Sequence, residues 1–145
     1  MENKLEQALN IAQTYDVTTP KDGAVVYSIS FMPTDENKKD AERFVKEHPF
    51  TKRLDDTPCG KALIALGLDG KVNEVGETIT KIWHVASERY IKAASGNIHA
   101  FVEGADERST FCTTELAEIM KNSKITHING VEKRQFIAVF EPKKY

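Results

Sequence analysis

The sequence predicts an α+β fold in which N-terminal helices pack with a small C-terminal β-sheet. Apolar residues recur at helical spacing near the N-terminus and again over residues 79–93. Short β-branched runs follow Gly96, and the pair Asn129–Gly130 is typical of a tight turn. The 145 residues are expected to form one domain over 1–145, long enough to bury a core without disulfides. Its helical part would cover about 1–75 and its sheet part about 76–145.

Three helices and a strand are expected in the first half. Residues 5–12 place leucine and alanine on one helix face, with polar residues opposite. Residues 24–30 (AVVYSIS) are apolar and β-branched, which predicts a buried strand. A helix is expected from Pro33 to about Lys46. It would end before Pro49, because the residue before a proline avoids the helical region. Residues 62–68 are apolar and predict one or two helical turns.

The clearest helix of the chain is expected over residues 79–93. Six apolar residues recur there at helical spacing: Ile79, Ile82, Trp83, Ala86, Tyr90 and Ala93. Gly96 supplies a stop after this helix, and residues 97–102 (NIHAFV) predict a strand.

The C-terminal segment is predicted to hold one more helix and a hairpin. Residues 116–121 favour a helix directly after Glu115. Residues 124–129 and 135–140 are strand candidates, and Asn129–Gly130 between them indicates that they pair as a hairpin.

Composition excludes several classes of protein. The formal net charge is −2 and the pI is about 6.1, so no basic field is expected to attract nucleic acid. The 40% hydrophobic content argues against disorder. No apolar run approaches the roughly 18 residues that span a bilayer, and the N-terminal MENKLEQ lacks the apolar stretch of a signal peptide.

A metal site is not expected. The candidate ligands are two cysteines and four histidines: Cys59, Cys112, His48, His84, His99 and His127. Two cysteines are too few for a cysteine-rich zinc site and are expected to be reduced thiols. The histidines lie in unlike contexts, which does not favour a metal-binding or acid–base nuclease role.

Residues 109–115 (STFCTTE) are the most informative segment, because they gather hydroxyls, an aromatic ring and a carboxylate. Glu115 has two interpretations: an acid in the first turn of the following helix, capped by Thr113 or Thr114, or a carboxylate that faces a developing oxocarbenium ion. Ser109 and Thr110 are either solvated loop hydroxyls or, with backbone N–H groups near a helix start, a phosphate-binding element.

Trp83, Asp55 and Asp56 also allow two interpretations each. Trp83 is either a core tryptophan or an aromatic wall for a flat cationic ring. Asp55 and Asp56 are either an ordinary loop pair or pocket acids that bind a carboxamide, steer water or change the protonation of a neighbour. Together with Glu115, this set of residues suits cleavage of a bond to a cationic leaving group, such as nicotinamide leaving NAD.

These residues occur in a familiar order, and the chain resembles the ADP-ribosyl cyclase family, which includes animal ectoenzymes that make and hydrolyse cyclic ADP-ribose. Residues 54–60 (LDDTPCG) are similar to its Leu-Glu-Asp-Thr motif with a following glycine. Residues 83–94 (WHVASERYIKAA) are similar to its Trp-x-x-x-Ser-x-x-Phe-x-x-x-Ala helix. Residues 97–104 and then 109–115 are similar to its strand, Ser-Thr-Phe loop and catalytic glutamate. Order and spacing agree across roughly residues 24–130.

The resemblance implies a role for each matching residue. Glu115 would engage the ribose attached to nicotinamide, Trp83 would pack on the substrate, and Asp55 would help to set cyclisation against hydrolysis. The remaining positions, expected to bind substrate, are Tyr27 (a second aromatic wall), Ser28, Asp56, Thr57, Ser109, Thr110 and Phe111. No metal or cofactor is implied, because NAD is the substrate.

Three departures from the family pattern shape the expected function. Asp55 is one methylene shorter than the family's glutamate, which puts cyclisation in doubt. Ile29 stands where the animal enzymes carry an arginine, so one phosphate contact is missing. The chain is also short and cysteine-poor, which resembles bacterial members that act as NAD-degrading toxin domains of secreted effectors. Such a domain would act in the cytoplasm of a target cell and be paired with an immunity protein.

We therefore expect an NAD glycohydrolase that releases nicotinamide and ADP-ribose from NAD, with NADP as a further candidate substrate. An ADP-ribosyl cyclase and a non-catalytic module that binds NAD or ADP-ribose are the alternatives. Nucleic-acid and membrane partners are not expected.

Overall fold

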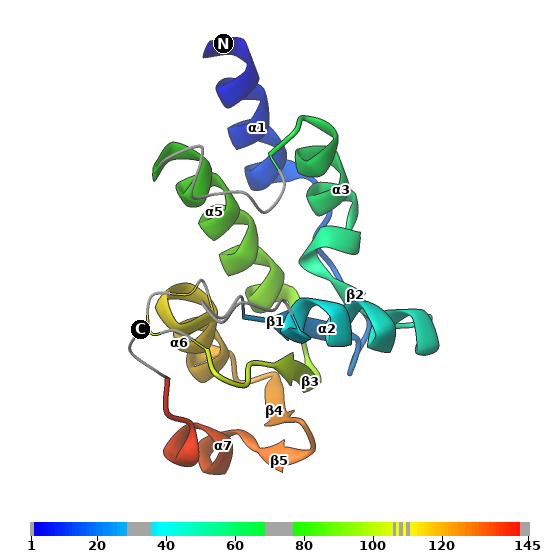
Figure 1. Ribbon diagram of the computed structural model, residues 1–145, viewed down its shortest axis with the longest axis vertical. Coiled ribbons are helices and arrows are strands. Elements are labelled where there is room, and N and C mark those ends of the chain that lie inside the picture. Colours follow the sequence, from blue (N-terminus) through cyan, green and yellow to red (C-terminus); the bar gives the residue numbers. More distant parts are fainter. Residues whose placement is uncertain are drawn as a thin grey trace.

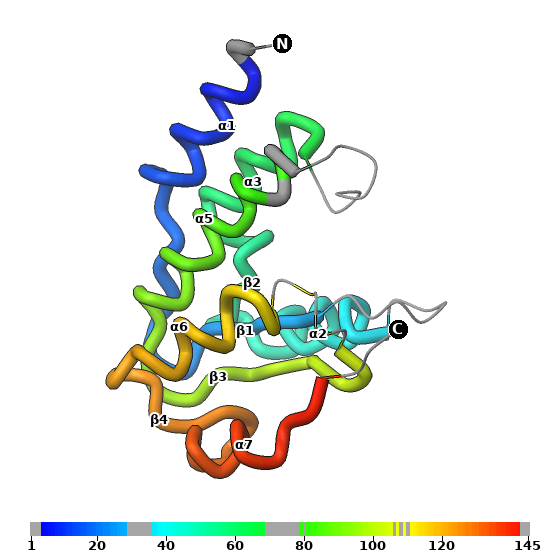
Figure 2. Tube along the Cα trace, turned by 90° about the vertical axis from the view of Figure 1, so that its left-hand side faces the viewer, coloured from blue at the N-terminus to red at the C-terminus, as the bar shows by residue number. Residues whose placement is uncertain are grey.

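The computed structural model describes residues 2–28, 36–68, 77–105, 107, 109 and 111–142, and it combines helices with one mixed β-sheet (Figure 1). Three helices form one end of the molecule: α1 (Glu2–Thr14), α3 (Pro58–Ala65) and α5 (Glu77–Ala93). The sheet and the remaining helices form the other end, and the tube in Figure 2 shows α1 and α5 extending away from the sheet. The predicted α+β class is confirmed.

The sheet has five strands in the spatial order β2-β1-β3-β4-β5. The strands are β1 (Ala24–Tyr27), β2 (Lys52–Arg53), β3 (Gly96–Phe101), β4 (Ile125–Ile128) and β5 (Val131–Glu132). Strands β2, β1, β3 and β4 run parallel to one another, and β5 runs antiparallel to β4. The sheet therefore recruits β1 and β2 from the first half of the chain, not only the C-terminal strands.

The two faces of β3 alternate as a strand requires. Ile98 and Ala100 face the hydrophobic core, whereas His99 and Phe101 face α2 (Glu36–Glu47). The ring of Phe44 on α2 lies 4.6 Å from the His99 ring and 5.6 Å from the Phe101 ring, measured between centroids. Helix α2 thus covers one face of β1 and β3, and the core covers the other.

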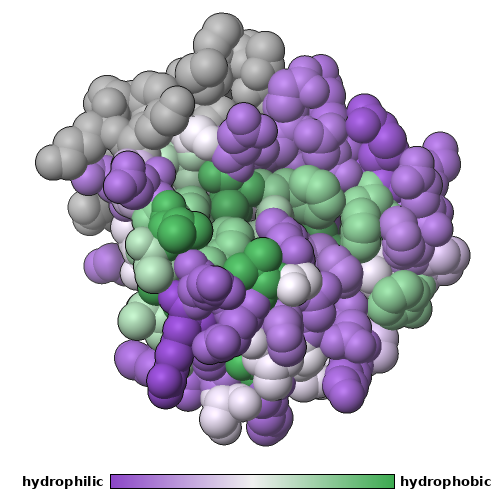
Figure 3. All heavy atoms as spheres, turned by 90° about the horizontal axis from the view of Figure 1, so that it is seen from below, coloured by the Kyte–Doolittle hydropathy of each residue, from purple (hydrophilic) through white to green (hydrophobic). Residues whose placement is uncertain are grey.

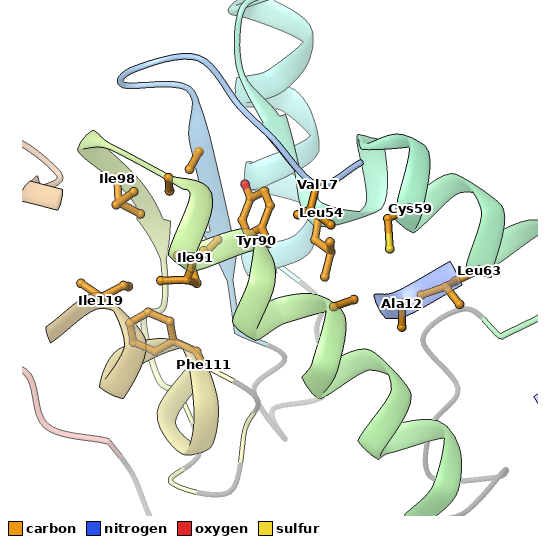
Figure 4. Packing of buried hydrophobic residues seen from close by; sticks show 14 of the residues in the cluster. Ala12, Val17, Leu54, Cys59, Leu63, Tyr90, Ile91, Ile98, Phe111 and Ile119 are labelled. Atoms are coloured by element: carbon orange, nitrogen blue, oxygen red, sulfur yellow. The ribbon is translucent and has the colours of Figure 1, made fainter. Parts of the chain in front are cut away.

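The core lies around α5, between the sheet, α1, α3 and α6 (Leu116–Lys121) (Figure 4). Its largest fully buried side chains include Tyr90, Phe111, Leu63, Ile91 and Ile98. Burying a large apolar side chain contributes about 1.5–3 kcal/mol, so this cluster supplies much of the stability. The Tyr90 hydroxyl also accepts a hydrogen bond from the Val25 amide at 2.8 Å, which fixes α5 to β1.

Side-chain donors cap the C-terminal ends of three helices. Arg89 donates to the carbonyls of Ala12 (2.7 Å), in the last turn of α1, and of Tyr15 (2.9 Å), directly after α1. Asn122 Nδ2 donates to the Ile91 carbonyl at 2.9 Å, and Lys133 Nζ donates to the Asn122 carbonyl at 2.9 Å. Cations and amide donors satisfy the carbonyls that a helix end leaves unpaired.

Several predicted elements are confirmed, with changes at their ends. The helices expected over 79–93 and 116–121 are α5 and α6, and the strands over 97–102 and 124–129 are β3 and β4. The strand expected over 24–30 is confirmed over Ala24–Tyr27, and α2 begins at Glu36; residues 29–35 lie outside the described ranges.

The strand predicted over 135–140 is wrong, because this segment is helix α7 (Lys133–Val139). The turn at Asn129–Gly130 does form, with φ of 53° and 77°, but only Val131–Glu132 pair with β4. Phe136 and Ile137 of α7, and Phe140 directly after it, pack against the core. A short apolar run fits either a strand or a helix, and packing decides between them. Val139 stays 75% exposed, and Figure 3 shows apolar side chains among polar ones on this side.

Candidate active site

The candidate site lies at the edge of the sheet where the parallel strands β1, β2 and β3 end. Tyr27 ends β1, Arg53 ends β2, and the 3₁₀ turn η1 (Leu54–Asp56) follows at once. In parallel sheets, ligands bind in the crevice outside the carboxyl ends of the strands. Tyr27, Asp55 and Asp56 reach this edge from two different strands.

Asp55 is held by two neighbours through one oxygen. The Tyr27 hydroxyl donates a 2.9 Å hydrogen bond to Asp55 Oδ2, and Arg53 Nη1 lies 3.8 Å from the same atom. Burial raises the pKa of Tyr27 well above its usual range, and the charge of Asp55 raises that pKa further. The phenol is therefore a fixed, protonated donor to the carboxylate.

Asp56 binds Arg53 in a bidentate pair. Arg53 Nε lies 2.9 Å from Asp56 Oδ2, Nη2 lies 2.9 Å from Oδ1, and the Arg53 amide donates to Oδ2 at 3.0 Å. Burial by itself would raise the pKa of Asp56, but the hydrogen bonds from Arg53 outweigh it and the pKa is lowered. Both oxygens of Asp56 thus accept hydrogen bonds from Arg53. Contact of Asp56 with substrate stays a prediction.

Thr57 ends η1 and caps α3. Its fully buried hydroxyl donates to the Leu54 carbonyl at 2.6 Å and accepts from the Gly60 amide at 3.1 Å. Pro58 at the first helical position extends α3 four residues before the expected start at residue 62. Thr57 therefore positions the turn that carries Asp55, and its direct contact with substrate stays a prediction.

The close approach of Gly60 to η1 gives a testable prediction. A Cβ added at Gly60 would lie 2.0 Å from the Leu54 carbonyl oxygen and 2.7 Å from Asp55 Cα. Gly60→Ala should therefore cost about 1–3 kcal/mol of stability, since the backbone must shift. Urea denaturation measures the loss.

Gly130→Ala is the control for this substitution. Nothing lies within 4 Å of a Cβ added there, and only its φ of +77° is unfavourable, which costs about 1–2 kcal/mol. Only Gly60→Ala should displace Asp55 and so shift the NMR resonances of the Tyr27 ring, whose hydroxyl donates to Asp55. An equal shift in both variants would contradict the steric explanation.

Glu115 ends a π-helical turn, η2 (Phe111–Glu115), that leads into α6. Its side chain is buried, with the residue 7% exposed, and within the described part of the chain no hydrogen bond or ion pair reaches the carboxyl group. Burial raises its pKa to about 8, and the charge of Asp55 adds to the shift. Glu115 and Asp55 therefore form an interacting pair at this edge. Single π-helical turns of this kind are frequent at functional sites.

Ser109 and Phe111 hold η2 in place. The Cys112 amide donates to Ser109 Oγ at 3.3 Å, and the Thr113 amide and hydroxyl each donate to the Ser109 carbonyl at 2.9 Å. Phe111 is fully buried and packs edge-on against Phe140, with 5.5 Å between ring centroids.

Phe111 is thus a core anchor for the segment that carries Glu115, and its contact with substrate stays a prediction. The expectation that Thr113 or Thr114 caps the helix after Glu115 is wrong, because the helical winding already begins at residue 111. Thr110 lies outside the described residues.

Trp83 is half-buried on α5, and its indole N–H donates to the Leu68 carbonyl at 2.6 Å. The next residue, His84, lies against η2: its Nδ1 is 2.9 Å from the hydroxyl of Thr114, which precedes Glu115. This contact places Trp83 and Glu115 on adjoining segments. The two interpretations of Trp83 are compatible, since its side chain packs against the core but is not fully covered.

Ser28 and Ser87 are buried hydroxyl residues near these segments. Ser28 is 1% exposed directly after β1, where its amide donates to the Phe101 carbonyl at 3.0 Å. Ser87 is 4% exposed and follows Trp83 by one helical turn, so both lie on the same face of α5.

Sequence reasoning did not select Arg53 or Ser87. The spacing of Arg53 three residues before Asp56 could have indicated the ion pair, and the spacing of Ser87 four residues after Trp83 could have indicated their common face.

The described residues contain no cluster of three or more metal-ligating side chains. No described helix is long and apolar enough to cross a membrane.

Comparison with known proteins finds no family model that matches this chain, and no curated protein matches it either. Solved structures do match. Apo porcine CD38 has a TM-score of 0.53 and 19% identity, over 87% of this chain and 66% of that chain. Porcine CD38 with a covalent intermediate, ribo-F-ribose-5'-phosphate, has a TM-score of 0.56 and 18% identity, over 87% and 67%. The chain has the fold of CD38.

A further CD38 structure, presented as evidence for a conformationally flexible covalent enzyme–substrate complex, agrees. Its TM-score is 0.53 and its identity 16%, over 94% of this chain and 83% of that chain. The predicted ADP-ribosyl cyclase-like fold is thereby confirmed. The chain spans about two thirds of the length of the porcine CD38 chains.

Proposed function

We propose that this chain is an NAD glycohydrolase that cleaves the bond between nicotinamide and ribose and releases ADP-ribose. The observation that carries the proposal is the buried Glu115 carboxyl, which interacts with Asp55 at the strand edge of a CD38-like fold. A fixed carboxylate in a desolvated site stabilises positive charge that develops on a sugar.

The reaction proceeds through loss of the leaving group. NAD carries a positive pyridinium ring, and the C1′–N bond breaks with its electron pair going to nitrogen, so that nicotinamide departs as a neutral molecule. Ionised Glu115 stabilises the oxocarbenium ion at C1′ by its charge or by a transient covalent bond. Water then adds to C1′ and loses a proton, which gives ADP-ribose.

Two aromatic residues and two serines complete the proposed substrate site. Trp83 and Tyr27 are walls for the pyridinium ring, which a ring face attracts by about 0.5–2 kcal/mol. Ser28 and Ser109, together with Thr110, bind the ribose or the phosphates. Asp55 accepts a hydrogen bond from the carboxamide of nicotinamide through the oxygen that Tyr27 does not occupy. NADP is a candidate second substrate.

The biological setting is part of the same proposal. We propose a bacterial effector toxin domain that depletes NAD in the cytoplasm of a target cell and is neutralised by a cognate immunity protein. Its support is the resemblance to short, cysteine-poor relatives that have this role.

Incubation of the purified protein with NAD, followed by chromatography of the products, tests the function. ADP-ribose with an equal amount of nicotinamide supports the glycohydrolase. Cyclic ADP-ribose as the main product would instead identify a cyclase. NAD that binds in calorimetry but stays intact would identify a non-catalytic binding module.

A further inference from the structure

The chain leaves the paired strands β1 and β3 toward opposite sides of the sheet. From β1 it passes through α2 to β2 on one side, and from β3 it passes through η2 and α6 to β4 on the other. Helix α2 covers one face of this strand pair (Figure 1), whereas α6 contributes Ile119 to the core on the other. The divergence point lies after Tyr27 and Phe101, the last paired residues of the two strands. In open α/β sheets, ligands bind where neighbouring strands diverge in this way.

Asn37, in the first turn of α2, bridges the two strands at the divergence point. The Ser28 amide donates to the Phe101 carbonyl at 3.0 Å, which extends the strand pairing by one residue. Beyond that bond, Asn37 Nδ2 donates to the Ser28 carbonyl at 3.0 Å and to the Glu103 carbonyl at 2.8 Å. Two carbonyl oxygens cannot bond to each other, and an amide NH₂ supplies the two donors that hold both. The Asn37 side chain therefore links the strand ends where backbone pairing stops.

Helix α2 holds Asn37 in place. Ala41, one turn further along, is fully buried, and the Phe44 ring contacts the rings of His99 and Phe101 on β3. An asparagine side chain has only two torsions, so a helix anchored in this way restricts where its NH₂ group lies. The separation of the two strand ends thus depends on Asn37 as well as on the pairing of β1 with β3.

Both segments that Asn37 links lead to residues of the proposed substrate site. Ser28 directly follows Tyr27, and the segment after Glu103 continues to Ser109, whose hydroxyl accepts a hydrogen bond from the Cys112 amide of η2. Ser28 and Ser109 are the residues proposed to bind the ribose or the phosphates. Two free carbonyl oxygens at this edge would repel a diphosphate, and their hydrogen bonds to Asn37 lessen that repulsion.

We propose that Asn37 is a positioning residue that holds the Ser28 and Glu103 segments at the separation required by the diphosphate of NAD, and so sets the affinity for the ADP-ribose part of the substrate. The inference rests on the proposed function and adds a residue that acts on binding without touching the reacting atoms. The hydrogen bonds of Asn37 do not involve α5 or η1, which carry Trp83 and Asp55. Loss of Asn37 should therefore affect one end of the substrate and spare the nicotinamide end.

Two ligands measure the two ends separately. Calorimetry gives the affinity for ADP-ribose, and quenching of tryptophan fluorescence gives that for nicotinamide, because Trp83 is the only tryptophan of the chain. Asn37→Leu keeps the branched shape of the side chain and removes both donors. It should weaken ADP-ribose binding about tenfold, the size of two neutral hydrogen bonds, and leave nicotinamide binding within about twofold. In turnover, KM for NAD should rise while kcat changes little.

Matched variants distinguish this role from a general effect on the fold. Asn10→Leu changes an exposed asparagine of α1 and should leave both affinities unchanged. Asn37→Gln keeps the NH₂ group and should recover part of the affinity for ADP-ribose. Asn37→Ala favours the helix and adds no apolar bulk, so it gives the same comparison if Asn37→Leu does not fold.

Binding measurements also separate the role of Asn37 from the proposed function. A wild type that binds ADP-ribose but leaves NAD intact would reject the glycohydrolase, and the same variants would still decide the role of Asn37. That role would be overturned by an unchanged affinity for ADP-ribose in Asn37→Leu and Asn37→Ala, or by an equal loss of affinity for both ligands. A wild type that does not bind ADP-ribose would overturn it as well.

Discussion

Replacing Glu115 with glutamine is expected to lower NAD turnover by about a thousandfold or more and, at the same time, to stabilise the protein above pH 8. The loss of turnover follows because an amide carries no negative charge to oppose the oxocarbenium ion. Glutamine has nearly the same shape as glutamate, so the core around η2 stays packed.

The gain in stability follows from linkage between protonation and folding. The folded-state pKa of Glu115 is raised from 4.5 to about 8, by burial and then by the charge of Asp55. Below pH 4.5 the group is protonated in both states and has no effect. Between pH 4.5 and 8 the unfolded state loses the proton first, so the wild type loses stability, by at most on the order of 5 kcal/mol. Glutamine does not titrate, so Glu115→Gln avoids this loss.

Urea denaturation of the wild type and Glu115→Gln at pH 4, 6 and 9 measures the effect. The two should be similar at pH 4, and the variant should be more stable at pH 9 by about 1–3 kcal/mol, less than the upper bound because site solvation relaxes. Glu132→Gln, an exposed glutamate on β5, is the control and should show no such trend. A variant that is less stable than the wild type at pH 9, or that retains turnover, would contradict the role of Glu115.

The second large effect is expected in the pH dependence of the reaction. If ionised Glu115 is the reactive form, kcat/KM for NAD should rise with pH and level off above a midpoint of about 8, the pKa of the free enzyme. The midpoint in kcat should be lower, because the bound pyridinium ring is positive and favours the ionised carboxylate.

Asp55→Asn is expected to move the midpoint of kcat/KM to lower pH. Asp55 is the second cause of the raised pKa, whereas burial, the first cause, is unchanged by this substitution. Asparagine also keeps an oxygen for the Tyr27 hydroxyl, so the local geometry is retained. Initial rates from pH 5 to 9 give the midpoint, with Asp40→Asn on α2 as the exposed control. A midpoint that stays in place or moves to higher pH would show that the two carboxyl groups do not interact.

Local spacing and turn chemistry in the sequence were enough to predict most elements. Residues 79–93 repeat apolar side chains at helical spacing, and α5 follows them closely. The segment 133–140 was not predictable in this way, because its spacing permits a strand and a helix, and only packing of Phe136 and Phe140 on the core selects the helix.

The candidate site was predictable to a smaller extent. Glu115 and Asp55 could be selected as residue types in a recognisable order. Their interaction and the burial of Thr57 and Phe111 depend on contacts between segments that are distant in the chain. The pairing of Arg53 with Asp56, three residues later, is local.

Taken by itself, the sequence determined which acids, aromatic residues and hydroxyls are available, and in which helices and strands most of them lie. Periodicity and turn propensity act over a few residues, so they are readable from a single chain. The tertiary structure alone decided that a carboxyl from η2 interacts with one from η1, and that Tyr27 and Arg53 restrain Asp55. Those properties depend on distance and on exclusion of water, which arise when the strand edge, α5 and η2 come together in the folded protein.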